Sequence, residues 1–209
     1  IELATGVSAN WIESTSKPVG SAGLPEDRIS AIAWTNASKT LVVEVPENLE
    51  VAEPTFLKLD LGEIGAKAVH IFVRAGANSK ATVVLDHTGS GSLAENVEIV
   101  LDSGAKLDFV SIQDWNRGSA HVSTQFTRLG KDSTLKHVVV SLGGDLVRVT
   151  PSAALDSPGA EIQMFGVYLA DSSNYFEHRP YVDHIAENCI SNVAYKGALQ
   201  GAGAHTVWV

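Results

Sequence analysis

Three aspartates in the middle of the chain are the first residues whose type and spacing could do chemistry. Asp102, Asp108 and Asp114 could form the paired carboxylates that polysaccharide-cleaving β-helix enzymes use. Asp108 and Asp114 are six residues apart, which corresponds to roughly 20 Å along an extended strand and is too far for one site. Asp102 falls in a turn sequence, where aspartate forms local hydrogen bonds. We therefore expect these carboxylates to lie in solvated turns and on an outer face.

Residue types that bind metals gather in the last part of the sequence as His178, His184, Cys189 and His205. His178 and His184 are six residues apart, so on one straight strand they point the same way but cannot hold a common ion. Zinc sites usually place two ligands roughly two to four residues apart. We expect a largely buried Cys189 thiol and hydrogen-bonded histidines, with no catalytic, cofactor-binding or metal-binding residue. The glycine-rich segment 200–204 is not a phosphate loop, because no Gly-Lys-Ser/Thr follows it.

Composition limits the class of protein. The chain of 209 residues has 44% hydrophobic residues and a net charge of −9. It can therefore bury a substantial core, and it has no basic run that would neutralise nucleic-acid phosphates. One cysteine excludes an internal disulfide and fits a reducing compartment. No apolar run approaches the ~20 residues that span a bilayer, so we expect a cytoplasmic protein.

The elements that would position these residues are short strands in a repeat. Alternating apolar runs, which are typical of strands, each follow a small polar turn. The first apolar residues of three such runs, Leu107, Leu135 and Ile162, are 28 and 27 positions apart. The turns that precede them are residues 101–106, 129–134 and 155–161. Further strands are expected at residues 40–45, 55–61, 68–73 and 81–85. A fixed period of this size is the sequence sign of stacked repeats.

This repeat predicts an all-β fold, a right-handed parallel β-helix (β-solenoid). Two short strands cannot bury an apolar face alone, but stacked units about 4.8 Å apart pair each strand with its equivalents above and below. Parallel crossovers are right-handed in nearly all cases. Leu107, Phe109, Leu135 and Ile162 should then point inward.

Two regions are expected within the chain. Residues 1–38 are predicted to be an irregular N-terminal segment packed on the first coils, and no substantial helix is expected anywhere. Residues 39–209 are predicted to be the β-helix core, truncated at its C-terminal side. The chain stops on the apolar strand Thr206-Val207-Trp208-Val209, which suggests a fragment of a longer protein. Because an unpaired solenoid edge favours further pairing, we expect the isolated fragment to form a homodimer that partly covers Trp208.

The last third of the sequence resembles a known family. Tyr-Leu-Ala-Asp at 168–171, Glu-His-Arg-Pro-Tyr-Val-Asp-His at 177–184 and Tyr-Lys-Gly-Ala-Leu at 195–199 resemble, in order and spacing, the core of the SufB/SufD family. Asn-Val-Glu-Ile at 96–99 and Gly104-Ala105 also fit, so the resemblance covers roughly residues 40–209. The SufD branch looks closer than SufB.

The resemblance implies a β-helix core between helical end regions. It also implies a non-catalytic scaffold subunit for iron–sulfur cluster assembly, which acts with a SufB-like homologue and a SufC-like ABC ATPase. The family's functional histidine and cysteine and its ATPase docking region correspond to sequence beyond residue 209. We therefore assign no cluster-ligand role to Cys189 or to any histidine, and expect no cofactor on this fragment. The residues that match family motif positions are His178, Arg179, His184 and Lys196.

Three functional hypotheses follow from the sequence. The first is the scaffold subunit. The second is a carbohydrate-active β-helix enzyme, a lyase or hydrolase, which predicts a groove of acidic and basic side chains on one outer face. The third, a left-handed acyltransferase solenoid, would need a six-residue period, which a period of 27–28 residues does not contain.

Overall fold

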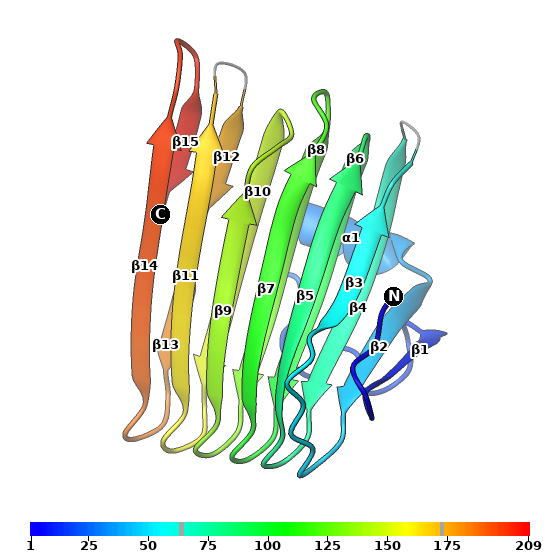
Figure 1. Cartoon of the computed structure of the whole chain (residues 1–209), viewed down its shortest axis with the longest axis vertical. Coiled ribbons are helices and arrows are strands. Elements are labelled where there is room, and N and C mark those ends of the chain that lie inside the picture. Colours follow the sequence, from blue (N-terminus) through cyan, green and yellow to red (C-terminus); the bar gives the residue numbers. More distant parts are fainter. Residues whose placement is uncertain (63–64, 172–173) are drawn as a thin grey trace.

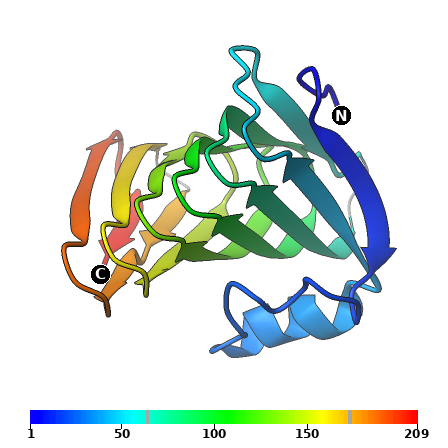
Figure 2. The ribbon, with the colours of Figure 1, turned by 90° about the horizontal axis from the view of Figure 1, so that it is seen from below.

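The chain folds into a parallel β-solenoid of about six turns with a repeat of about 28 residues. The computed structural model describes residues 1–62, 65–171 and 174–209. Each turn of the solenoid gives one strand to each of two facing sheets (Figures 1 and 2). The six-stranded sheet contains β3 (Thr55–Asp60), β5 (Lys80–Gly89), β7 (Lys106–Trp115), β9 (Thr134–Ser141), β11 (Glu161–Ala170) and β14 (Ile190–Leu199).

The nine-stranded sheet lies opposite and has β1 at one end. Its members are β1 (Ser8–Glu13), β2 (Lys39–Val45), β4 (Ala66–Ala75), β6 (Ser92–Leu101), β8 (Ala120–Leu129), β10 (Leu146–Leu155), β12 (Tyr175–His178), β13 (Tyr181–His184) and β15 (His205–Trp208). Strands β12 and β13 both pair with β10, one after the other. Pro180 lies between them, and proline cannot donate to a ladder of backbone hydrogen bonds.

The predicted inward register is confirmed. Leu107 pairs with Leu135, and Leu135 pairs with Ile162 on the next coil. All three side chains, together with Phe109, are buried. The alternation in the sequence therefore identified the interior face of the six-stranded sheet.

The interior has an apolar half and a more polar half. The apolar half lies toward the turns that carry the chain from the nine-stranded to the six-stranded sheet, and it is filled by leucine, valine and isoleucine side chains from most of the coils. The second half contains a smaller apolar cluster around Trp115, Val147 and Phe176. Its remaining inward positions carry buried polar side chains.

The turns on the apolar side stack in a column of left-handed residues. Each turn has one residue with φ between 53° and 73°, a conformation that favours Asn, Asp and Gly. Its backbone N–H donates to a carbonyl in the equivalent turn of the next coil along most of the column. The residues of the column are Asn48, Asn78, Gly104, Asp132, Gly159 and Asn188. This requirement explains the small polar residues that begin each repeat.

The N-terminal segment is more regular than expected. Strand β1 pairs antiparallel with β2, and helix α1 (Arg28–Asn36) lies on the outer face of the nine-stranded sheet (Figure 2). Asp27 caps the helix by accepting from the backbone N–H groups of Ile29 and Ser30. The helix has nine residues, of which only Ser30 and Ala33 are buried. That is too short and too weakly patterned to show a helical period in the sequence. The chain is nearly all-β, in agreement with the expectation of no substantial helix.

A buried carboxylate on the outer face of the sheet holds this segment. Glu98 is fully buried, and its side chain accepts from the backbone N–H groups of Gly20 and Ala22 at 2.8–3.0 Å and contacts His70 Nε2 at 2.9 Å. Asn96, on the same face of β6, donates to the carbonyl of Ser30 in α1. The docking of residues 20–30 therefore depends on polar side chains of β6.

Among the residues that the structure describes, no helix is long and apolar enough to cross a membrane.

Candidate functional site

A chain of buried polar side chains runs through the interior across four coils. Glu95 on β6 accepts from Ser123 on β8 at 2.8 Å, and Gln125 on β8 donates to Ser123 and to Ser111 at 3.2 Å each. The chain continues from Ser111 on β7 to Gln113 on the same strand, at 2.7 Å. All five side chains are fully buried. Such a network needs partners for nearly every polar atom, because an unpaired buried group is costly.

The far end of this chain is His178 on β12. Ser141 on β9 donates to Gln113 Oε1 at 2.9 Å and lies 3.1 Å from His178 Nε2. The His178 ring stacks on Tyr168 with centroids 5.1 Å apart, and the Tyr195 ring lies 5.5 Å from it. The network therefore links the middle of the solenoid to the coil formed by β11 and β12.

The other end of the chain is a cluster of two histidines and a glutamate. His87 Nε2, on β5, lies 2.9 Å from Glu95 Oε1, and His121 Nε2, on β8, lies 3.3 Å from Glu95 Oε2. His87 Nδ1 lies 2.7 Å from the carbonyl oxygen of Ile112. Trp115 packs against both imidazole rings, at 5.4–5.5 Å between centroids. The three ionisable side chains have no solvent exposure.

Burial and the neighbouring charges set the protonation of this cluster. Burial alone would raise the pKa of Glu95, but His87 and His121 hold that pKa far below its usual range. Burial lowers the pKa of His87, and the opposing Glu95 carboxylate more than compensates, so that this pKa is raised. Burial lowers the pKa of His121, which stays neutral. These directions favour a charged His87 paired with the Glu95 carboxylate and a neutral His121 beside them.

Comparisons with known proteins give the family. The model for "SUF system FeS cluster assembly, SufBD core domain" matches residues 60–209. The chain is 37% identical over 216 residues to "Iron-sulfur cluster assembly SufBD family protein ML0594" of Mycobacterium leprae, which covers 100% of the chain and 55% of that protein. It belongs to the SufBD family. A second relative, "Iron-sulfur cluster assembly SufBD family protein Rv1462" of Mycobacterium tuberculosis, is 39% identical over 98% of the chain and 53% of its own length.

A plant protein shows a more distant similarity. "Protein ABCI7, chloroplastic" of Arabidopsis thaliana is 28% identical over 135 residues, which are 58% of this chain and 28% of that protein. The SufBD chain spans about half the length of the mycobacterial relatives that it matches.

The SufBD motif positions separate into one interior residue and three exposed ones. His178 is buried in the polar network, whereas Arg179, His184 and Lys196 are exposed. Arg179 Nε forms an ion pair with Glu177. His184 Nε2 lies 2.8 Å from Ser191 Oγ. Only His178 therefore belongs to the interior site.

The other candidates from the sequence are not brought together. Cys189 is partly buried against the apolar core, and its thiol lies 3.4 Å from the carbonyl of Ser157. Strand β14 begins directly after Cys189 and lies at the edge of the six-stranded sheet. No further coil covers this edge in the described part of the chain. Asp108 and Asp114 are exposed, as predicted. Asp102 forms an ion pair with Arg74 at 2.8 Å.

The cluster of His87, Glu95 and His121 was not predicted from the sequence, because the repeat was followed through apolar positions only. The three residues occupy inward positions of their strands, but they are 8 and 26 residues apart. The same period, followed through polar residues, would have indicated this site. Glu95 pairs in register with Ser123, and Gln113 pairs in register with Ser141. Polar residues at interior positions of a repeat are the unusual observation.

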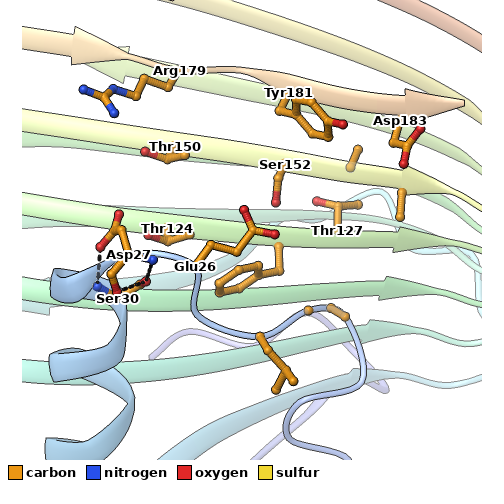
Figure 3. Close-up of a pocket in the computed structure, with 16 residues that line it drawn as sticks. Glu26, Asp27, Ser30, Thr124, Thr127, Thr150, Ser152, Arg179, Tyr181 and Asp183 are labelled. Carbon is orange, nitrogen blue, oxygen red and sulfur yellow. Dashed lines mark hydrogen bonds between the residues drawn. The ribbon is translucent and has the colours of Figure 1, made fainter.

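A pocket of about 420 Å³ lies on the outside of the nine-stranded sheet, beside the segment that leads into α1 (Figure 3). Its floor carries the outward hydroxyls of Thr124, Thr150 and Ser152 (Figure 3). Charged side chains line its rim, and they include Glu26 and Asp183.

A carbohydrate-active groove of the kind predicted would place acidic and basic side chains on the outward positions of successive coils. In this pocket β8 and β10 contribute hydroxyl-bearing residues, whereas the next coil contributes Arg179 and Asp183. Acidic and basic side chains of successive coils also line a second outer pocket, where they form the ion pairs Arg74–Asp102 and Arg128–Asp156.

The motif tyrosines and glycines form a reciprocal contact that predicts a mutational effect. Gly197 pairs with Tyr168, and Gly166 pairs with Tyr195, on adjacent strands. A Cβ on Gly197 would lie only 1.8 Å from the Tyr168 ring. We expect Gly197→Ala to displace this ring from His178 and to lower the free energy of unfolding by about 1–3 kcal/mol, the usual cost of overpacking. Urea unfolding followed by far-ultraviolet circular dichroism measures this change.

The exposed glycine Gly65, whose Cβ would meet nothing within 4 Å, is the control position, because its φ lies outside the left-handed region. An unfolding free energy for Gly197→Ala equal to that of the unmodified protein would contradict the proposed packing of Tyr168 on Gly197.

Proposed function

We propose that this chain is the core of a non-catalytic scaffold subunit of a Suf iron–sulfur cluster assembly complex. It would act with a SufB-like homologue and a SufC-like ABC ATPase, in the cytoplasm. The observation that carries the proposal is the match of the SufBD core domain to residues 60–209. The iron–sulfur cluster is cargo of the complex, and we assign none of its ligands to this chain.

One edge of the solenoid is unpaired in the described part of the chain. Strand β14 lies at the edge of the six-stranded sheet. Ile190, Val193 and Leu199 on this strand are exposed apolar residues. An edge strand of this kind pairs readily with further strands, so additional coils of the whole protein, the homologous partner or a second copy of the chain would each cover it.

The proposal favours the SufD branch over SufB, on the motif resemblance in residues 168–199. A carbohydrate-active β-helix enzyme is the alternative, and neither the relatives nor the hydroxyl-lined floor of the outer pocket favours it.

Co-purification tests the scaffold proposal. The full-length protein, tagged and co-expressed with a SufB-like homologue and a SufC-like ATPase, is expected to bring both proteins down in a fixed ratio that survives gel filtration. ATPase activity and iron content are measured on the same fractions. Co-expression without the SufB-like homologue is the control, and it should lower iron content. Recovery of the tagged protein alone when both partners are co-expressed would overturn the proposal.

A further inference from the structure

The inside of the solenoid brings three metal-ligating side chains to one point. His87 of β5, Glu95 of β6 and His121 of β8 each offer one ligand atom, and these atoms lie within 4.8 Å of one another. We propose that His87, Glu95 and His121 bind a divalent transition-metal ion in the interior of the solenoid. The proposal does not depend on the scaffold function, because it concerns an ion held by this chain alone.

The separations of the ligand atoms fit a metal site. Metal–nitrogen and metal–oxygen bonds of about 2.0–2.2 Å at a tetrahedral angle place neighbouring ligand atoms about 3.3–3.6 Å apart. His87 Nε2 lies 2.9 Å from Glu95 Oε1, and His121 Nε2 lies 3.3 Å from Oε2, the other oxygen of the same carboxylate. The three ligand atoms lie within 4.8 Å of one another. Small rotations of the side chains would therefore bring all three atoms into the coordination sphere of one ion.

Hydrogen bonds outside the cluster orient two of the ligands. The carbonyl oxygen of Ile112, 2.7 Å from His87 Nδ1, can only accept. His87 Nδ1 therefore carries a hydrogen, and Nε2 faces Glu95. The ion would displace the proton that Nε2 shares with the Glu95 carboxylate. Ser123 Oγ donates to Glu95 Oε2 at 2.8 Å. Partners of this kind, a carbonyl behind a histidine and a hydroxyl behind a carboxylate, are typical of the second layer of metal sites.

The third ligand provides the independent observation. His121 is fully buried, yet neither of its ring nitrogens has a hydrogen-bond partner in the described structure. Its Nε2 lies 3.3 Å from Glu95 Oε2 with an orientation outside that of a hydrogen bond. A buried polar group without a partner is costly. Coordination of an ion by Nε2 would remove that cost for this nitrogen.

The donor set indicates the class of ion. Two imidazoles and one carboxylate suit Zn²⁺ and Fe²⁺, whereas Mg²⁺ and Ca²⁺ prefer oxygen ligands alone. Three protein ligands leave at least one coordination position open for a water molecule or another small ligand. The Trp115 ring beside both histidines limits the size of such a ligand. Because the three ligand side chains are fully buried, the ion would enter while the chain folds.

Refolding with defined metals tests the site. The full-length protein is unfolded in denaturant with a chelator, then refolded with Zn²⁺, anaerobic Fe²⁺, Co²⁺ or Mg²⁺ and desalted. We expect about one Zn²⁺, Fe²⁺ or Co²⁺ per chain and no Mg²⁺ by mass spectrometry of the metals. The Co²⁺ form should show the visible absorption bands of a four- or five-coordinate site with nitrogen and oxygen ligands. Retention of no transition metal by the unmodified protein would overturn the proposal.

Variants locate the ion. Glu95→Gln and His121→Asn are each expected to lower the bound metal at least ten-fold. Glu98→Gln is the matched control, because it changes a second fully buried carboxylate that contacts a histidine, His70, but lies outside the cluster. His137→Asn is the second control, because it changes a buried histidine elsewhere in the interior. Both should retain about one ion per chain. Stoichiometric metal in folded Glu95→Gln and His121→Asn would place the ion elsewhere and refute the site; if both fail to fold, the Co²⁺ spectrum of the unmodified protein still decides.

Discussion

Replacing Glu98 by alanine is expected to lower the free energy of unfolding by about 3–5 kcal/mol, the cost of removing one partner from a buried ionic cluster. The Glu98 carboxylate has no solvent exposure. The variant leaves the backbone N–H groups of Gly20 and Ala22 and the ring of His70 without their acceptor. Because these groups belong to the N-terminal segment and to β4, the segment should separate from the sheet before the solenoid unfolds.

Two measurements check this result. Urea unfolding gives the loss of stability, and limited trypsin digestion should show faster cleavage after Arg28, at the start of α1. Asp114→Ala is the control, because Asp114 is an exposed carboxylate on β7. A Glu98→Ala protein as stable and as resistant to trypsin as Asp114→Ala would mean that the contacts of Glu98 do not hold the segment.

Acidification from pH 6.5 to pH 4 is expected to destabilise the fold strongly, through two buried histidines. Burial lowers the pKa of His137 and of His178 from 6.5 to about 4. The unfolded chain therefore binds more protons than the folded chain between these pH values. The stability is complete above about pH 6.5 and decreases as the pH falls toward 4, by about 3 kcal/mol for each histidine. Their sum is comparable with the whole stability of an ordinary domain.

His137→Leu isolates one of these contributions. Neither ring nitrogen of His137 has a hydrogen-bond partner in the described structure, and the ring stacks on Phe109. The variant should be at least as stable as the unmodified protein at pH 7 and should lose less stability on acidification, by about 3 kcal/mol at pH 4. Urea unfolding at pH 7, 5.5 and 4 measures the difference between the two proteins. Contributions from groups that titrate in both proteins, such as Glu95, cancel in this difference. A difference between the two proteins that does not change with pH would refute the low pKa of His137.

The sequence by itself determined the repeat, the strands and the apolar face of the interior. Leu107, Leu135 and Ile162 were enough, because neighbouring coils of a parallel solenoid place residues one period apart directly beside each other. The small turn residues were equally informative, since a left-handed backbone at Asn78, Gly104 and Asp132 restricts the residue type. The motif segments within residues 168–199 also indicated the family, because their order and spacing can be read directly along the chain.

Only the tertiary structure decided which polar residues meet. Glu95 meets His87 across the interior, because their strands belong to facing sheets. Glu95 meets His121 along the sheet, because their strands belong to adjacent coils. The spacing along the sequence does not predict these contacts. His87 and His121 are 8 and 26 positions from Glu95, and only the width of the interior and the stacking of the coils bring them together. The tertiary structure also gives His178 and His184 different surroundings. They point to the same side of the sheet, but His178 lies under the rings of Tyr168 and Tyr195, whereas His184 lies where no such side chains cover it.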